Sequence, residues 1–430
     1  MTAPRRVAIV LALLVFAQPL HSRESADSSK EGSDLVYFNE GHLARVKSAI
    51  RAGDPYFLEN YRKILAESEL LLTQPADPVV NKTMMPPSGD KHDYLSYAPY
   101  RWPDEDKADG LPWKAIDGVT NPAARGPDTD YTRLSDFSSA METLSFAYYF
   151  SGDTRYSDRA LELMELWFVN PDTRVNPNLN YTQHVPGLAE GRAAGILEWA
   201  RISNVITAMQ IFERGEVLPA ELKAELLGWM NRYLDWLVTN RLGKEADKLP
   251  QNHANWYNFQ VVGLMIYLGR LDEARAKVED AKTSRIAAQI KPNGQQPGET
   301  GRTKSMHYSC MNLWALANLT YMGRGLDVDL WEFRTKDGRS LPQAYHFLEP
   351  FALGEKEWPY KQITPGGAAA AIEAELKPLF SKTSTLLETD LLRPPPGTRI
   401  DLLPIDALRY PPRAKLANPG APTKTKDRSD

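Results

Sequence analysis

The stretch Asn293–Tyr308, NGQQPGETGRTKSMHY, gathers residue types that can do chemistry where a helical pattern begins. Arg302 and Lys304 are cations that can hold an anion, and His307 and Tyr308 can transfer a proton. Arg302 and Tyr308 are six residues apart, which in one continuous helix would leave them about 120° off one line. They converge more easily if Arg302 belongs to the loop and Tyr308 to the first helical turn.

Taken alone, that stretch has an ordinary explanation. Cations at a helix entrance are mostly solvated, and a tyrosine in the first turn of an apolar helix mostly packs in the core. We favour this explanation for Lys304 and His307. We do not favour it for Arg302 and Tyr308, because a second stretch offers them partners.

The second stretch is Leu249–Phe259, LPQNHANWYNF. Asn252 could cap the helix that follows it. His253 and Tyr257 are four residues apart, so they share one face of that helix. By itself this segment is as consistent with a structural role as with a functional one.

The elements that must position these residues are mostly helices. Strand-like alternation is scarce before about residue 345. Apolar residues recur at helical spacing over 55–72, 132–150, 155–168, 190–213, 219–239, 254–268, 271–289 and 306–322.

Several predicted helices end at a glycine, which adopts the left-handed conformation of a helix cap at little cost. The repeated elbows predict stacked helical hairpins, and their irregular spacing argues against an open solenoid. We therefore expect an all-α fold, an α/α toroid (an incomplete barrel of helical hairpins) with long aromatic loops over a cleft. The elbow glycines are Gly53, Gly152, Gly215, Gly269 and Gly323.

Two long loops stand out, 74–131 and 170–188. The first contains DYLSYAPYRWPDEDKADGLPW, and so many aromatic residues outside a helix are hard to explain as core. Aromatic rings beside polar groups suit sugars, which present apolar C–H faces and hydroxyl edges. The candidate sugar platforms are Tyr97, Tyr100, Trp102 and Trp113. The second loop is rich in Asn and Pro and contains His184.

Composition excludes several classes. Hydrophobic residues make up 42% and charged residues 25% of the 430 residues, as in a soluble globular protein. A net charge of -4 argues against a general nucleic-acid or membrane-surface binder. The single cysteine, Cys310, permits no intramolecular disulfide and lies in an apolar helical run, which predicts a buried thiol.

The N-terminus has Arg5 and Arg6 before an apolar run, Val7 to Ala17, too short to span a bilayer. We expect a signal peptide over 1–22, with an N-terminal anchor helix as the alternative. We also expect a periplasmic or secreted protein that is a monomer. A disordered linker over 23–34, a catalytic domain over 35–395 and an extended, disordered tail over 396–430 complete the expected organisation.

Together, the motifs resemble the alginate lyase superfamily of polysaccharide lyases, and family 38 more than family 5. Asn252-His253 is similar to the family's Asn-His pair, and Arg302 and Tyr308 in ETGRTKSMHYS are similar to its Arg and Tyr. NYTQHVPGLAEGRAAGILEWARI resembles a further family segment, although Glu198 and Trp199 depart from its usual pattern. The resemblance covers roughly residues 80–325.

This resemblance implies β-elimination at a uronic acid, in which the C5 proton leaves and the bond from C4 to the glycosidic oxygen breaks. Asn252, His253 and Arg302 would neutralise the C6 carboxylate, because an amide, an imidazole and a fixed cation can all hold it. Tyr308 would act as base and then as acid, which requires a nearby cation to favour the phenolate.

The stereochemistry at C4 and C5 of the sugar determines how many acid–base groups the reaction needs. In mannuronate and glucuronate the C5 hydrogen and the C4 oxygen lie on one side, so one residue can serve as base and acid. Guluronate needs a second group, for which His184 and His253 are candidates. We therefore expect an anionic polysaccharide substrate, with poly-mannuronate in alginate favoured and glucuronan as the alternative. The remaining candidate substrate-binding residues are Tyr257, Arg192, Lys304, Tyr97, Tyr100, Trp102 and Gln183.

Three other functions stay open at this point. A glycoside hydrolase needs two carboxylates flanking the bond, and Glu142, Glu190, Glu198 and Glu299 form no convincing pair. A non-catalytic sugar-binding protein would not need the four residues assigned to the reaction. A metal enzyme is not indicated, because the seven histidines show no metal-binding spacing. We expect no cofactor and leave a structural metal ion open.

Overall fold

Helices dominate the computed structural model, which describes residues 35–391 and 400–416. The α-helices are α1 Glu40–Arg51, α2 Pro55–Leu71, α3 Tyr131–Ser151, α4 Thr154–Phe168, α5 Ile202–Arg214, α6 Ala220–Thr239, α7 Arg241–Ala246, α8 Asn252–Tyr267, α9 Leu271–Ala281, α10 Pro297–Thr300, α11 Ser305–Arg324, α12 Leu341–Ala352, α13 Gly367–Ala371, α14 Lys377–Leu386, α15 Pro404–Arg409 and α16 Arg413–Leu416. Two small sheets join them: β1 (Leu95–Tyr97) pairs in parallel with β4 (Tyr181–His184), and β2 (Arg101–Trp102) pairs with antiparallel β3 (Lys114–Ala115).

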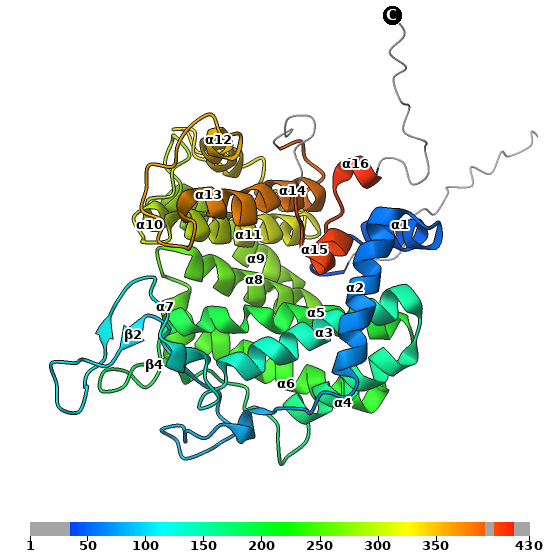
Figure 1. Ribbon diagram of the computed structural model, residues 1–430, viewed down its shortest axis with the longest axis vertical. Helices are drawn as coiled ribbons and strands as arrows, with labels where there is room; N and C mark the ends of the chain where they lie inside the picture. Colours follow the sequence, from blue (N-terminus) through cyan, green and yellow to red (C-terminus); the bar gives the residue numbers. More distant parts are fainter. Residues whose placement is uncertain (1–34, 392–399, 417–430) are drawn as a thin grey trace, which may run out of the picture. The chain divides into compact units, whose positions relative to one another are not determined.

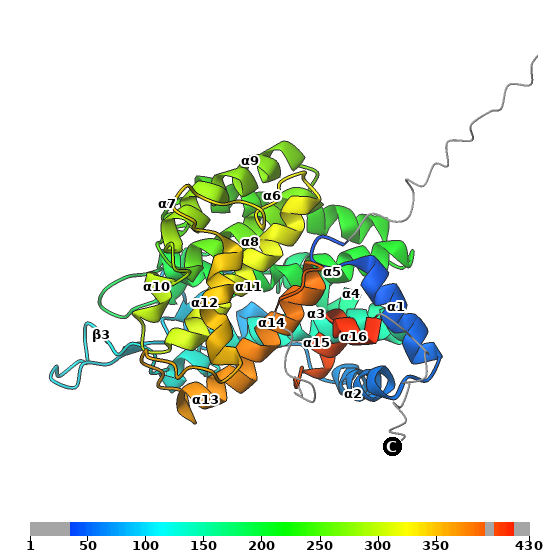
Figure 2. The same ribbon diagram turned by 90° about the horizontal axis from the view of Figure 1, so that it is seen from above.

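Four helices form the inner wall of the ring. α3 packs against α5, α5 against α8, and α8 against α11. α3, α8 and α11 bury residues on every face, as expected of helices surrounded by other helices. Partner helices lie outside them, with α4 against α3, α9 against α8 and α14 against α11. Figure 2 shows these layers from above. The expected all-α toroid is therefore the observed architecture.

The predicted helices are found, with two changes of helix type. The segment predicted over 190–213 is a 3-10 helix, Ala193–Arg201, followed by α5. The segment predicted over 271–289 is α9 followed by a π-helical turn, Lys282–Ala287. After residue 340 the described chain is helical as well, with α12, α13 and α14.

Three of the five elbow glycines adopt the left-handed conformation: Gly53, Gly152 and Gly269 have φ angles of 80°, 79° and 76°. The prediction is wrong at Gly215, whose φ is -81°, and the left-handed residue there is Glu216. The prediction is also wrong at Gly323.

Gly323 lies inside α11, and the chain turns only afterwards, with the left-handed residue at Asp327. A Cβ at Gly323 would lie 2.6 Å from the carbonyl oxygen of Val328. This glycine is therefore required by a close approach of backbone, and not by a turn.

The C-terminal residues close the ring. The Tyr410 ring lies 5.0 Å from the Trp314 ring of α11 and 5.7 Å from the Phe38 ring. Arg409 forms an ion pair with Glu142 of α3 and stacks over the Phe38 ring at 4.2 Å. The chain after α14 therefore bridges the two ends of the inner wall.

This closure corrects the expected boundary at residue 396. The extended tail is wrong for residues 400–416, because α15 packs against α1 and α2 and Tyr410 is buried. The signal peptide over 1–22, the linker over 23–34 and residues 417–430 lie outside the described residues. Among the residues described, no helix is long and apolar enough to cross a membrane.

The small sheets lie beside α7, at one side of the helical body (Figure 1). β4 leads directly toward the 3-10 helix Ala193–Arg201, which packs against α8. The β2–β3 hairpin belongs to the aromatic loop that precedes α3. These loops and the first turns of α8 and α11 surround the site described next.

Candidate active site

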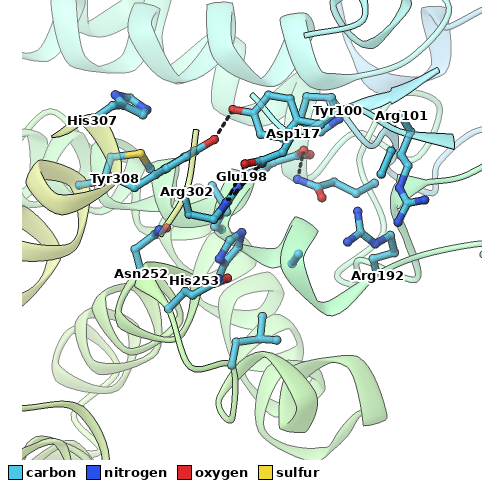
Figure 3. Close-up of a pocket in the computed structure, with 18 of the residues that line it drawn as sticks. Tyr100, Arg101, Asp117, Arg192, Glu198, Asn252, His253, Arg302, His307 and Tyr308 are labelled. Atoms are coloured by element: carbon cyan, nitrogen blue, oxygen red, sulfur yellow. Dashed lines mark hydrogen bonds and ion pairs between the residues drawn. The ribbon is translucent and has the colours of Figure 1, made fainter. Parts of the chain in front are cut away.

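A cavity of about 460 Å³ opens between the loops and the inner helices. Figure 3 shows its polar side chains. Of the residues proposed from the sequence, seven line the cavity: Tyr100, Gln183, Arg192, Asn252, His253, Arg302 and Tyr308. Seven polar residues that we had not proposed for the site also line it: Arg101, Asp117, Arg125, Tyr131, Glu198, Gln251 and His307.

Tyr308 lies in the first turn of α11, as the spacing predicted. Its hydroxyl donates a hydrogen bond to the Tyr100 hydroxyl, with 2.8 Å between the oxygens. The guanidinium carbon of Arg302 lies 4.2 Å from the centre of the Tyr308 ring. Burial and the bond to Tyr100 raise the pKa of Tyr308 above its ordinary value, although Arg302 acts in the opposite direction. The phenol is therefore protonated in the free protein at neutral pH.

Arg302 is bound by an acidic residue that the sequence did not single out. Asp117 accepts from both Nε and Nη2 of Arg302, the shortest distance being 2.7 Å. Asp117 also accepts from the backbone N–H and the hydroxyl of Thr303. Partial burial would raise the pKa of Asp117, but these hydrogen bonds outweigh burial and lower it to about 2. The aromatic loop is thus joined to the stretch that carries Arg302.

Asn252 is the first residue of α8 and is bound by Glu299. The backbone N–H and the Nδ2 of Asn252 donate to the two carboxylate oxygens of Glu299, at 2.6 and 2.9 Å. The expectation that Asn252 caps the helix is wrong, because Gln251 occupies the N-cap position. Glu299 instead places a negative charge at the helix N-terminus. Glu299, for which the sequence indicated no role, positions Asn252.

His253 is neutral in this site. Burial lowers the pKa of His253 to about 4, and the nearby cations Arg302 and Arg192 act in the same direction. Its buried Nδ1 has no hydrogen-bond partner among the described residues. Because His253 lines the cavity, its imidazole can hydrogen-bond to a ligand, but it carries no positive charge at pH 7.

Glu198 is a buried carboxylate in the cavity wall. It accepts hydrogen bonds from the hydroxyls of Tyr94 and Ser96, at 2.8 and 2.7 Å, and from the Gln183 amide at 3.2 Å. Burial raises the pKa of Glu198, although these hydrogen bonds oppose the rise. Gln183 has a φ of 49°, so this contact holds a strained residue in place.

Six of the residues proposed for the site, Trp113 among them, do not line the cavity. Tyr257 is buried in the core, and its hydroxyl donates to the carbonyl oxygen of Leu237. Tyr97 packs against Trp113 and His184, with 4.9 and 6.0 Å between the ring centres. His184 contacts the Glu190 carbonyl oxygen through its Nδ1.

Trp102 and Lys304, the other two proposed residues, lie close to the cavity. Trp102 donates from its Nε1 to the carbonyl oxygen of Val119 within the loop layer. Lys304 approaches the Tyr100 ring at 5.7 Å, which puts it beside the cavity. Tertiary packing, which spacing along the chain does not contain, separates these residues from the site.

The residues missed by sequence reasoning carried no local signal. Asp117 stands in an Asp-Gly turn, and Arg101 is in the aromatic loop. Tyr131 begins α3, and the Arg125 guanidinium stacks on its ring at 3.6 Å. Only the folded loop brings these side chains to the cavity.

No group of three or more His, Cys, Asp or Glu residues suited to a metal ion occurs in the described part of the chain. Cys310 is buried, as predicted. The expectation that the protein needs no cofactor stays a prediction.

A family model for alginate lyases matches residues 78–358. Among solved structures, an alginate lyase from Bacteroides ovatus is similar at a TM-score of 0.78 and 30% sequence identity, over 89% of this chain and 98% of that one. A variant of alginate lyase A1-III complexed with a tetrasaccharide is similar at a TM-score of 0.51 and 13% identity, over 81% of this chain and 93% of that one. That enzyme comes from Sphingomonas species A1, and its likeness concerns the fold alone. A search of curated proteins finds no match.

The helical toroid and these matches define a polysaccharide lyase. Within this class, the chain belongs to the alginate lyase family. The hydrolase and non-catalytic alternatives are therefore set aside. Of the four glutamates considered for a hydrolase, only Glu198 lines the cavity.

Proposed function

We propose that this enzyme cleaves a uronic-acid polymer by β-elimination, and that poly-mannuronate in alginate is its favoured substrate. The observation that carries the proposal is the meeting of Tyr308, Arg302, Asn252 and His253 in one cavity. The similar protein from Bacteroides ovatus is an alginate lyase, which supports alginate among the uronic-acid polymers.

The first requirement is to hold the carboxylate of the reacting unit. The C5 proton is too weakly acidic while that carboxylate keeps its full charge. Asn252 and the neutral His253 offer hydrogen bonds, and Arg302 offers charge. Asp117 occupies Nε and Nη2 of Arg302, and no described residue accepts from Nη1. A substrate carboxylate can therefore bind Arg302 without displacing Asp117.

The second requirement is proton transfer. After Tyr308 has lost its own proton to solvent, its phenolate removes the C5 proton, the C4=C5 double bond forms, and the bond from C4 to the glycosidic oxygen breaks. Tyr308 then returns the proton to that oxygen. Because the pKa of Tyr308 is raised in the free enzyme, the adjacent Arg302 guanidinium has to stabilise the phenolate during the reaction.

The geometry of the proton transfer favours mannuronate or glucuronate. A single acid–base group suits these sugars, whose C5 hydrogen and C4 oxygen lie on one side. His184, one of two candidates for a second group, does not line the cavity. His253 remains as the candidate second group for guluronate. Glucuronan is therefore the second candidate substrate.

The test is to incubate the purified enzyme with poly-mannuronate, poly-guluronate, alginate and glucuronan. Ultraviolet absorbance of the new double bond measures elimination, and reducing ends measure total cleavage. We expect the fastest rise in absorbance with poly-mannuronate. A faster reaction with glucuronan or poly-guluronate would overturn the preference. New reducing ends without absorbance would overturn elimination itself.

We also propose export to the periplasm or the outside of the cell, action as a monomer, and no need for a cofactor. The apolar run near the N-terminus supports export. Activity that survives dialysis against a chelator would support the proposal that the enzyme needs no metal cofactor.

A further inference from the structure

Two arginines on the far side of the cavity from Tyr308 have no acidic partner in the part of the chain that the structure describes. Figure 3 shows Arg101 and Arg192 together at one side, with His307 and Tyr308 at the other. Burial lowers the pKa of Arg192, and the positive charge of Arg101 lowers it further. The two guanidinium groups are therefore close enough to repel each other, which costs free energy in the empty cavity.

Two other buried or half-buried arginines are compensated by carboxylates, whereas Arg125 of the same cavity stacks on the Tyr131 ring. Arg302 has Asp117, and the buried Arg133 has Asp77 within 3.0 Å. Within the described residues, no carboxylate pairs with Arg101 or Arg192. Among residues 35–391 and 400–416, the only side-chain hydrogen bond of either arginine is a long one, 3.5 Å from Arg101 to the carbonyl oxygen of Trp113.

The cavity wall contains no spare negative charge for this pair. Its two carboxylates, among the residues described, are Asp117 and Glu198. Asp117 is engaged by Arg302 and Thr303, and Glu198 by neutral hydroxyl and amide donors. An anion supplied by a ligand would relieve the repulsion between Arg101 and Arg192 and would form charge-assisted hydrogen bonds with both.

We propose that Arg101 and Arg192 bind the carboxylate of a second uronate, in the unit next to the one that reacts at Tyr308. This inference rests on the proposed function and extends it to the substrate class. The enzyme would recognise contiguous uronate units, and would act poorly on polymers in which neutral sugars separate them.

The role of the pair is binding and not chemistry. A contact with a unit that does not react is made equally in the ground state and in the transition state, so its loss raises KM and leaves kcat largely unchanged. A contact with the reacting carboxylate would instead lower kcat. This difference separates the second subsite from the reactive one.

The experiment compares the Arg101→Gln/Arg192→Gln double variant with the wild type on the polymer that the wild type cleaves best. Arg62→Gln, an exposed residue of α2 away from the cavity, is the matched control. We expect KM to rise at least about tenfold in the double variant, with kcat within about threefold. Arg192→Lys, which keeps the charge, should restore part of the loss. An unchanged KM, or a loss confined to kcat, would overturn the proposal.

A second arm changes the substrate. The same polymer is prepared with about half of its carboxylates reduced to neutral alcohols. Loss of reactive units slows both enzymes equally, whereas loss of the neighbouring carboxylate slows only an enzyme that binds it. We therefore expect a larger fall in kcat/KM for the wild type than for the double variant. Equal falls would overturn the subsite.

Failure of the proposed function gives a different result. If the wild type forms no double bond with any polymer, β-elimination fails, and equilibrium binding of the intact polymer still tests the pair. Weaker binding by the double variant, with a smaller salt dependence, would support an anion subsite. Equal binding by both proteins would overturn it.

Discussion

The hydroxyl of Tyr308 is in an environment that favours its protonated form in the free enzyme. Burial and the Tyr100 hydroxyl both raise its pKa, and Arg302 at the face of its ring lowers it. A base is most effective when its pKa lies near the working pH. The reaction therefore depends on how strongly Arg302 stabilises the phenolate once substrate excludes water from the cavity.

Tyr308→Phe removes the hydroxyl and keeps the ring under Arg302. We expect kcat to fall at least about 10³-fold, because the base and the acid are lost together. Affinity for a uronate tetrasaccharide should stay within about threefold, as measured by calorimetry. Substantial turnover by this variant would show that another group removes the C5 proton.

The pH dependence of kcat/KM follows from two groups with shifted pKa values, His253 and Tyr308. His253, with a pKa of about 4, is already neutral above about pH 5 and contributes no change near neutrality. Tyr308 must lose its proton, and its pKa is raised, so the phenolate fraction grows with increasing pH throughout the neutral range. We expect kcat/KM to rise from pH 7 to pH 9 without a plateau. A plateau beginning near pH 6 would contradict this assignment.

The loop before α3 is the element that completes the site. It carries Tyr100, Arg101 and Asp117 to the cavity, and Asp117 joins it to Arg302. The neighbouring Gly118 has a φ of 78°, and a Cβ there would lie 2.3 Å from the Thr303 hydroxyl oxygen. The loop is therefore seated closely against the stretch that precedes α11.

Gly118→Ala tests whether this seating matters. The added methyl group would push the loop away from Thr303 and weaken the Asp117–Arg302 pair, so we expect kcat/KM to fall about tenfold, or about 1.4 kcal/mol. Gly89→Ala is the control, because Gly89 has a φ of 77° and open space where its Cβ would be. Both variants share the free-energy cost of placing an alanine at a positive φ. Equal activity in the two would mean that the loop position is unimportant for catalysis.

At the scale of the whole molecule, a buried ion pair fastens the loops to the helical ring. Lys82 and Asp130 are fully buried, with 2.9 Å between Nζ and Oδ2. Asp130, which immediately precedes α3, also accepts a hydrogen bond from the backbone N–H of Leu95 in β1. Lys82 donates to the carbonyl oxygens of Val79 and Lys91. This one pair therefore joins residues 79–95, near the beginning of the long loop, to the residue that precedes α3.

Lys82→Met should destabilise the fold by about 3–5 kcal/mol, because Asp130 is left buried with only the more distant Arg133, at 4.0 Å, as a counter-ion. Lys63→Met breaks an exposed pair with Glu59 on α2 and should change stability by less than about 1 kcal/mol. Denaturant unfolding of both variants makes the comparison. Similar losses in the two would show that the Lys82–Asp130 pair does not carry this energy.

Much of the ring was predictable because helix formation is largely a local matter. Helical periodicity located α2, α3, α4, α6, α8 and α11 within a few residues. The elbow at Gly215 was misplaced by one residue and that at Gly323 by four, because a glycine inside a helix and one after it look alike in sequence. The helices α15 and α16 were missed, since this part of the chain packs against residues distant in sequence, such as Phe38 and Trp314 around Tyr410 and the helix α1 beside α16.

The sequence by itself determined the helical hairpins, the family resemblance and the pairing of Asn252-His253 with Arg302 and Tyr308. Those residues occupy the first turns of helices or the segments before them, where local pattern is informative. Only the tertiary structure decided that Asp117 holds Arg302, that Glu299 holds Asn252 and that Tyr257 belongs to the core. The contacts of Asp117 and Glu299 join residues 185 and 47 positions apart, and the place of Tyr257 depends on burial by several other elements. The spacing of residues along the chain predicts neither long-range contacts nor burial of this kind.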